Sequence, residues 1–183
     1  MGYEAAITKA WQDLLKLKPK QDITVKFLAD EYAVDLEKKK VFSLVCNVLA
    51  KDFTTILILH YLTQQLKGLP KLIGEWLTFR EFSGIEGYYP AFKKRAIEPI
   101  IRKYAKSPAS LLDCLDRLPA KRVEGGDVSI VLNAFEGVPA LIQFWRQDEE
   151  FGPDANMLFD KSVTGIFCTE DIIVLGGLVA AAL

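Results

Sequence analysis

The sequence predicts an α+β fold, with residues 1–183 forming a single domain in which antiparallel hairpins pack with several helices. Three observations support this prediction. Segments of helical period are interleaved with short segments of period two, as in mixed α+β proteins. Neither an internal repeat nor a low-complexity segment is present. Half of the residues are hydrophobic and 26% are charged, which is typical of a globular domain with one core.

Two helices are predicted in the N-terminal part. Residues 3–17 place Trp11 and Leu14 at helical spacing, and Pro19 lies just beyond the segment, where a helix has to stop. Residues 52–66 form the second helical pattern, with Asp52 expected at the cap and a glycine just past the end.

Strands are expected between these two helices. Apolar residues alternate with polar ones over residues 23–27 and again over 32–36, and residues 41–45 follow a turn of lysines. This alternation predicts an antiparallel meander. The alternative is a helix over residues 24–32, because short apolar runs fit either period.

The C-terminal part is predicted to contain strands, helices and one clear hairpin. The predicted elements are a strand over 75–82, a helix over 90–106 that Pro99 must kink or split, and a short helix that begins at Ser107 or Ser110 and ends at Leu118. Residues 127–135 and 138–145 then form a hairpin through Glu136-Gly137. The last helix, about 170–183, begins after a cap at Thr169 and is apolar nearly all round, so we expect it to be buried.

Charge and hydropathy exclude several classes of partner. The formal net charge is −1, so no global field attracts nucleic acid or an anionic membrane. No apolar run reaches the ~20 residues that a bilayer crossing needs. The first 18 residues lack the unbroken apolar centre of a signal peptide, and a cytoplasmic location is therefore expected.

The cysteines and the single histidine do not suggest a metal site. Cys46, Cys114 and Cys168 are odd in number and far apart, unlike a disulfide framework or a zinc or iron–sulfur ligand run, and we expect buried thiols. Cys168 precedes the expected helix cap, where a helix dipole lowers a thiol pKa. His60 lies on an apolar helix, where a hydrogen-bonded core or boundary role is the expectation. No nucleophilic triad or phosphate loop is visible, and the sequence does not identify a cofactor.

The first cluster of chemically interesting residues lies between Arg80 and Arg95. Gly84 and Gly87 stand at a predicted strand-to-helix junction beside Tyr88, and a helix N-terminus follows. Free backbone N–H groups and the positive end of a helix suit an anionic group. The alternative is a tight connection that needs glycine for its backbone angles.

The second cluster is the acidic run Asp148, Glu149 and Glu150, which lies between aromatic residues beside Gly152-Pro153. In a dry pocket the three carboxylates cannot all be ionised side by side, so the pKa of at least one of them rises. A raised pKa suits Asp148 or Glu150 to act as general acid or base. They also suit a hard cation, with Asp154 or Asp160 as further ligands. The alternative is a solvated turn at the end of a hairpin strand.

A longer ordered pattern contains both clusters and covers most of the chain from about His60 onward. Its motifs are Glu75-Trp76, Phe79-Arg80-Glu81, Gly84, Gly87-Tyr88, Phe92, Arg95, Gly126-Asp127, Val138-Pro139, Trp145, Asp148-Glu149-Glu150-Phe151, Leu158-Phe159-Asp160, Ser162, Thr169-Glu170-Asp171 and Leu175-Gly176. In this pattern the sequence resembles the uncharacterised family called domain of unknown function 3786. The resemblance implies relatives mainly in anaerobic bacteria and archaea, some fused to a cysteine-rich iron–sulfur domain like that of corrinoid proteins in one-carbon metabolism.

The chain departs from the family in two ways. It has none of the cysteine-rich extension, so no iron–sulfur cluster is expected in this chain. Many relatives have histidine in the segment 162–167, where Gly165 stands here, and a metal or acid–base role at that position loses its support.

Three hypotheses follow. The first is a cytoplasmic accessory or ligand-binding module, linked through the resemblance to anaerobic one-carbon, corrinoid or other tetrapyrrole-related metabolism. Its pocket lies between the Arg80-to-Arg95 junction and the Trp145-to-Asp160 segment, and it holds an anionic small molecule. The second is an enzyme in which Asp148 or Glu150 transfers a proton while Arg80 or Arg95 stabilises negative charge. The third makes the acidic segment a docking edge for a protein partner. The expected ligand-binding residues are Arg80, Tyr88, Arg95, Trp145, Asp148, Glu149, Glu150 and Asp160.

Overall fold

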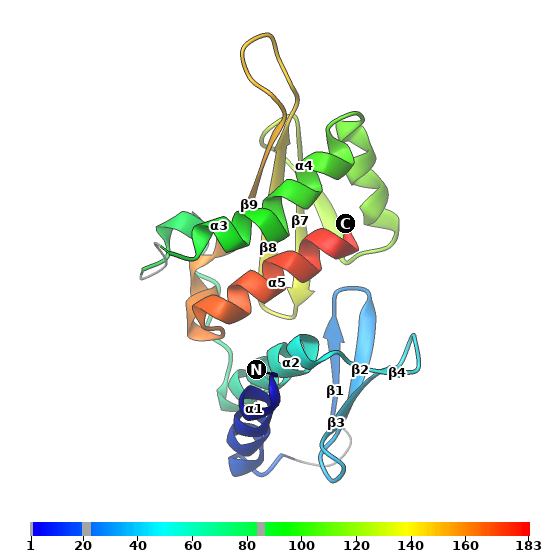
Figure 1. The fold of residues 1–183 in the computed structure, drawn as a ribbon, viewed down its shortest axis with the longest axis vertical. Helices are drawn as coiled ribbons and strands as arrows, with labels where there is room; N and C mark the ends of the chain where they lie inside the picture. Colours follow the sequence, from blue (N-terminus) through cyan, green and yellow to red (C-terminus); the bar gives the residue numbers. More distant parts are fainter. Residues whose placement is uncertain (1, 20–22, 84–86) are drawn as a thin grey trace.

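Two antiparallel sheets and the helices that pack on them make up the computed structural model, which describes residues 2–19, 23–83 and 87–183 (Figure 1). Within these residues the smaller sheet has the strand order β1-β2-β3-β4 and the larger one β5-β9-β8-β7-β6. Every neighbouring pair of strands is antiparallel. The predicted α+β class is therefore confirmed.

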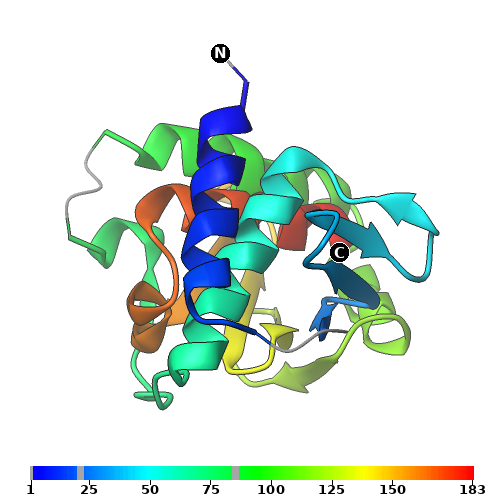
Figure 2. The ribbon, with the colours of Figure 1, turned by 90° about the horizontal axis from the view of Figure 1, so that it is seen from below.

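The N-terminal part consists of two helices and the smaller sheet. Its elements are α1 (Glu4–Lys16), β1 (Ile23–Phe27), β2 (Asp30–Asp35), β3 (Lys40–Ser43), β4 (Val48–Leu49) and α2 (Asp52–Lys67). The two helices lie side by side, with the sheet beside them (Figure 2). The meander prediction is confirmed and its helical alternative is wrong, because Val25 and Val34 are buried on one face while β1 and β2 pair from Ile23 to Phe27.

The C-terminal part contains the larger sheet. Its elements are β5 (Trp76–Thr78), η1 (Phe79–Glu81), α3 (Tyr89–Phe92), η2 (Lys93–Ile97), α4 (Glu98–Tyr104), η3 (Pro108–Asp116), β6 (Ala120–Val123), β7 (Val128–Phe135), β8 (Val138–Trp145), β9 (Asp154–Asp160), η4 (Lys161–Gly165) and α5 (Thr169–Ala182). The run α3–η2–α4 and the helix α5 lie along one face of this sheet (Figure 1).

The helix predicted over 90–106 is split as expected. Pro99 lacks an N–H and its ring crowds the preceding turn, and the five residues before Glu98 wind as a π-helix, η2. Helix α5 packs closely against this run. A Cβ added at Gly176 would lie 2.6 Å from a ring carbon of Phe92, so glycine is needed for the close approach. Ile172, Leu175 and other α5 side chains are buried, which confirms the expectation of a buried last helix.

Aromatic residues join the two parts into one core. The ring of Phe135, on β7, stacks on Phe27 of β1 at a centroid distance of 4.5 Å and on Tyr61 of α2 at 4.3 Å. The Tyr61 hydroxyl donates to the carbonyl of Glu136 in the β7–β8 turn. The antiparallel pairing of β7 with β8 confirms the hairpin predicted over 127–145. Through Phe135, this hairpin also contacts the smaller sheet.

Several predicted boundaries are corrected by the structure. The strand expected over 75–82 ends at Thr78, because Phe79 turns into the core and η1 follows. Strands β4, β6 and β9 were not predicted. The segment after Ser107 is a 3-10 helix, η3. The caps of α2 and α5 are Lys51 and Cys168, one residue before the positions expected.

Candidate ligand-binding cleft

A polar cleft of about 350 Å³ separates the segment η1–α3–η2 from the first half of β9, and we call it the β9 cleft. Its lining residues are Thr78, Phe79, Arg80, Tyr89, Phe92, Lys93, Ile97, Asp154, Ala155, Asn156 and Met157. The volume is at the lower end of the range for small-ligand sites. The cleft lies between the same two segments that the sequence analysis selected.

Because β5 is short, residues 154–157 of β9 have no strand partner on this side among the residues described, although Ala155 and Met157 are buried by the segments that pack there. β5 pairs with Leu158, Phe159 and Asp160 only, so residues 154–157 extend past its end. Successive side chains of a strand point to opposite faces, yet all four of these residues line the cleft. The cleft therefore lies along the edge of β9, where Asp154 and Asn156 are the accessible residues.

Arg80 is a cation of the β9 cleft that an aromatic contact orients. Its guanidinium carbon lies 3.9 Å from the ring centroid of Tyr89, a cation–π contact that orients the exposed side chain. The turn that carries it is closed by Glu81, whose carboxylate accepts hydrogen bonds from the N–H and the hydroxyl of Thr78, both at 2.7 Å. These bonds hold the pKa of Glu81 below its usual value, so the closure persists at neutral pH.

Lys93 lines the same cleft from the first position of the π-helix η2. The rings of Phe79 and Phe92 stack at 4.3 Å and are nearly parallel, which ties η1 to the helix end that carries Lys93. The two cations are thus held on one wall by a buried aromatic contact.

Asp154 and Asn156 lie on the opposite wall. The Asp154 carboxylate accepts a hydrogen bond from the N–H of Ala155 at 2.8 Å, and its residue is exposed, whereas Asn156 is half-buried. Two cations, one carboxylate and one amide give a site that suits an anionic group together with a hydrogen-bonding group.

A second pocket of about 560 Å³ adjoins the β9 cleft and shares Asp154 and Asn156 with it. Trp145 and Asp148 line this pocket, so two of the expected ligand-binding residues lie next to the cleft that contains Arg80. Arg80 therefore lines one pocket, and Trp145 and Asp148 line the neighbouring one.

The acidic run is part of a loop that projects beyond the larger sheet (Figure 1). β8 ends at Trp145, and Asp148, Glu149 and Glu150 are all exposed. The Asp148 carboxylate accepts hydrogen bonds from the N–H groups of Phe151 (2.7 Å) and Glu150 (2.9 Å), which lower its pKa. A low pKa on a turn-closing carboxylate is the reverse of what a general acid needs at neutral pH.

Asp160, Tyr88 and Arg95 were also expected to bind the ligand, but they line neither of these two pockets. Asp160 is 3% exposed and accepts hydrogen bonds from the N–H groups of Ile73, Gly74 and Ser162 at 3.0, 2.6 and 2.9 Å. The Tyr88 hydroxyl donates to Glu170, and this bond raises the Tyr88 pKa. Arg95 is exposed on η2 and does not line the cleft. Gly84, from the expected anion-binding turn, is outside the described residues.

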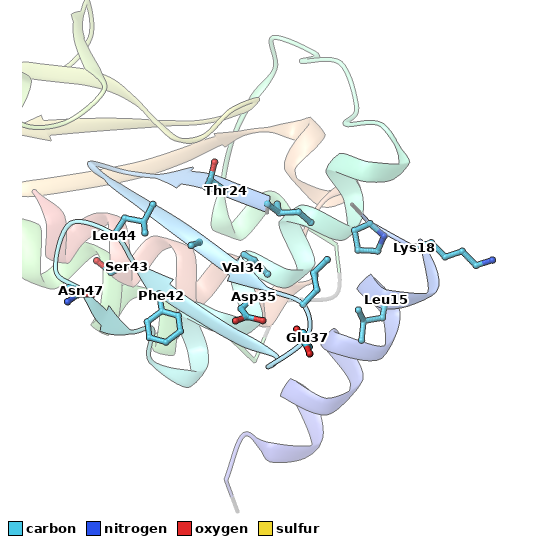
Figure 3. A pocket seen from close by; sticks show the side chains of 14 residues that line it. Leu15, Lys18, Thr24, Val34, Asp35, Glu37, Phe42, Ser43, Leu44 and Asn47 are labelled. Atoms are coloured by element: carbon cyan, nitrogen blue, oxygen red, sulfur yellow. The ribbon is translucent and has the colours of Figure 1, made fainter. Parts of the chain in front are cut away.

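An open groove of about 940 Å³ lies between the end of α1 and the small sheet (Figure 3). Apolar side chains such as Leu15 and Phe42 face it, and Asp35 and Glu37 lie at one end. Asp35 is engaged locally, since it accepts the N–H of Lys38 and pairs with its ammonium group. The lining of this groove is mainly apolar, whereas the lining of the β9 cleft is mainly polar.

His60, Asp171 and Cys168 form a polar cluster at the start of α5. His60 Nδ1 lies 2.8 Å from Asp171 Oδ2, and the Cys168 thiol donates to the same oxygen at 3.2 Å. Partial burial of the sulfur and the carboxylates of Asp171 and Glu170 raise the Cys168 pKa to about 11, so the dipole effect considered from the sequence does not prevail. The expectation of three buried thiols holds for Cys114 only, because Cys46 and Cys168 are exposed.

The strand β9 and the position of Asn156 in the cleft were not predicted from the sequence. The signal was present but short, because Ala155 and Met157 alternate with Asp154 and Asn156 after Pro153. The pairing of His60 with Asp171 had no local signal, since the two residues are 111 positions apart.

A family model described as Domain of unknown function (DUF3786) matches residues 10–182, nearly the whole chain. The chain belongs to this family. The match covers both walls of the β9 cleft and the acidic loop, and it includes the motifs on which the resemblance was recognised. No curated protein and no solved structure matches the chain.

Among the residues described, none of the helices has the length and apolar character that a membrane crossing requires. Nor, within those same ranges, do three or more His, Cys, Asp or Glu side chains gather in a way that would hold a metal ion.

Proposed function

We propose that this protein is an accessory binding module that holds the anionic group of a ligand in the β9 cleft. The observation that supports this best is the Arg80 guanidinium, which stacks on Tyr89 in a cleft that Lys93, Asp154 and Asn156 also line. A cation that is already oriented loses less side-chain entropy when it binds an anion.

The setting proposed for this module is the cytoplasm and, through the family resemblance, anaerobic one-carbon or corrinoid metabolism. All three cysteines are free, which suits a reducing compartment. The proposal involves no nucleic acid and no membrane, in keeping with the net charge of −1. The proton-transfer hypothesis gains no support from the geometry, because Asp148 and Glu150 are exposed in a loop.

The test is a titration of the uniformly ¹⁵N-labelled protein with sodium acetate and with inorganic phosphate, followed by amide NMR shifts. Shifts are expected at residues 154–157 and around Arg80. Arg80→Ala is expected to weaken binding about tenfold, which corresponds to ~1.4 kcal/mol and to the loss of about one hydrogen bond to a charged group.

Two matched variants control for the loss of positive charge. Arg102→Ala removes an exposed arginine from α4, and Lys94→Ala removes the lysine next to Lys93; neither residue lines the cleft. Both are expected to leave the affinity unchanged, whereas Lys93→Ala weakens it. Equal losses in Lys93→Ala and Lys94→Ala, or shifts that do not change in Arg80→Ala, would contradict the proposal.

A further inference from the structure

Charges of both signs line the β9 cleft without pairing with one another. Arg80 and Lys93 lie on one wall and Asp154 on the other. Among the residues described, no ion pair joins either cation to Asp154 or to any other carboxylate. The cleft therefore holds two cations and a carboxylate apart, across a gap that these side chains do not bridge.

The Asp154 carboxylate lies on the side of β9 that faces the cleft. The N–H of Lys161 donates to the carbonyl of Glu75 at 2.8 Å, so the backbone groups of odd-numbered residues along β9 point to the side of β5. The N–H of Ala155 belongs to this series, and it donates to Asp154 Oδ1 at 2.8 Å. This bond holds the carboxylate at the edge of β9, away from β8, and leaves Oδ2 for a ligand.

Side-chain ends, and not peptide groups of the strand, are what a ligand in this cleft meets. Ala155 and Met157 are 2% and 1% exposed, whereas Arg80, Lys93 and Asp154 are exposed. The volume of about 350 Å³ suits a small molecule, and the mainly polar lining suits a hydrophilic one.

Electrostatics favours a ligand that carries both charges. A carboxylate beside Arg80 and Lys93 gains charge-assisted hydrogen bonds, but Asp154 repels it. An ammonium group on the same ligand is attracted to Asp154 and repelled by the two cations. The charges of the cleft thus fix a single orientation for a molecule whose own charges lie at opposite ends.

We propose that the β9 cleft binds a small zwitterion of the amino-acid class, whose carboxylate is held by Arg80 and Lys93 and whose ammonium group is held by Asp154. This inference rests on the proposed function and names the ligand class for the same site. The carboxylate is the anionic group of the proposed function, and the ammonium group distinguishes this ligand from a simple anion.

The experiment titrates the whole ¹⁵N-labelled chain at pH 7 and low ionic strength and follows amide NMR shifts. The amino acids used are glycine, β-alanine and 4-aminobutyrate, which differ in the distance between their charges. Acetate, propionate and butyrate are the matched carboxylates without an ammonium group, and n-propylamine lacks the carboxylate. We expect at least one amino acid to bind about tenfold more tightly than its matched carboxylate and than n-propylamine.

Asp154→Asn separates the zwitterion from the simple anion, because the two respond in opposite directions. The change is expected to weaken binding of the amino acid about tenfold and to strengthen binding of acetate about twofold, since the repulsion is removed. Asp116→Asn is the matched control, because Asp116 is exposed at the end of η3 and does not line the cleft; we expect no change for either ligand. Arg80→Ala is expected to weaken binding of both.

The outcomes separate this inference from the proposed function. The zwitterion inference is overturned if no amino acid binds more tightly than its matched carboxylate, or if the advantage of the amino acid persists in Asp154→Asn. It is also overturned if Asp154→Asn weakens binding of acetate as much as binding of the amino acid. In each of these cases, acetate and phosphate that bind in an Arg80-dependent way leave the anion site standing. Absence of binding by the amino acids, the carboxylates and phosphate overturns both.

Discussion

Replacing Asp160 with asparagine tests whether this carboxylate, expected from the sequence to belong to a binding site, instead serves folding. Its Oδ1 accepts the N–H groups of Ile73 and Ser162, and its Oδ2 accepts that of Gly74 at 2.6 Å. In Asp160→Asn the remaining oxygen still accepts two of these bonds, but the new NH₂ group faces the N–H of Gly74. The flipped amide is worse, because it loses two acceptors instead of one.

The expected cost follows from these three bonds. Losing one hydrogen bond to a charged, buried acceptor costs roughly 1.5–3 kcal/mol, and the other two weaken when the charge is removed. We therefore expect the free energy of unfolding to fall by about 2–4 kcal/mol. For a chain of this length each kcal/mol shifts Tm by roughly 2–4 °C, so the expected drop in Tm is about 4–16 °C.

The loss also depends on pH. Burial raises the Asp160 pKa, but the hydrogen bonds from Ser162, Ile73 and Gly74 outweigh it and hold the pKa below the usual value. A carboxyl group with a lowered folded-state pKa contributes stability above its unfolded pKa of about 3.9, and this contribution is lost as pH falls through the folded value. The difference between the wild type and Asp160→Asn is therefore expected to be full above about pH 5 and to shrink in acid.

Urea unfolding at pH 7 and pH 3.5, followed by circular dichroism, measures both effects. Asp154→Asn is the matched control. Asp154 is exposed, and the oxygen of an asparagine amide can still accept its one side-chain hydrogen bond, from the N–H of Ala155. We expect its free energy of unfolding to change by no more than about 0.5 kcal/mol. Unchanged stability in Asp160→Asn, or a loss that is the same at both pH values, would refute the reasoning.

Three further predictions concern packing and the thiol. Gly176→Ala places a Cβ 2.6 Å from the Phe92 ring, and we expect it to lower the free energy of unfolding by about 1–3 kcal/mol in urea. Gly177→Ala is the control, because its Cβ would lie 3.6 Å from the nearest atom, and we expect it to be neutral or slightly stabilising. Equal effects of the two variants would contradict the packing argument. Phe135→Ala removes a ring that packs on both parts of the core, and we expect it to lower the free energy of unfolding by about 3–5 kcal/mol. We also expect a single unfolding transition in calorimetry, and two separate transitions would contradict this. The Cys168 thiol is expected to react slowly with iodoacetamide at pH 8 and faster as pH rises toward about 11, and a rate that levels off below pH 9 would exclude the raised pKa.

Local periodicity was sufficient for most elements of the fold. The hairpin over 127–145 and the helices beginning near Glu4, Asp52 and Thr169 follow from apolar spacing and from turn or cap residues a few positions away. The strand after Glu75 is shorter than its alternation predicts, because the burial of Phe79 against Phe92 turns the chain after three residues. That contact joins positions 13 apart, beyond the reach of a local pattern.

The candidate site was predictable to the level of segments but not of side chains. The sequence selected the two segments that flank the cleft, and the structure brings Arg80 to it from the first. From the second segment, however, Asp154 and Asn156 face the cleft, while Asp148 closes a turn in the loop. The function of Asp160 was also hidden, because two of its three partners lie 86 and 87 positions away.

By itself, the sequence determined the α+β class, the order of the main helices and strands, the near-neutral charge and the family, because these depend on residue type and on spacing along the chain. Only the tertiary structure decided where β5 ends, and with it that residues 154–157 line a cleft together with Arg80 and Lys93. Strand pairing and side-chain packing join residues far apart in sequence, and the free energy of those contacts overrides local preference. The cleft exists because the chain turns away from β9 after Thr78.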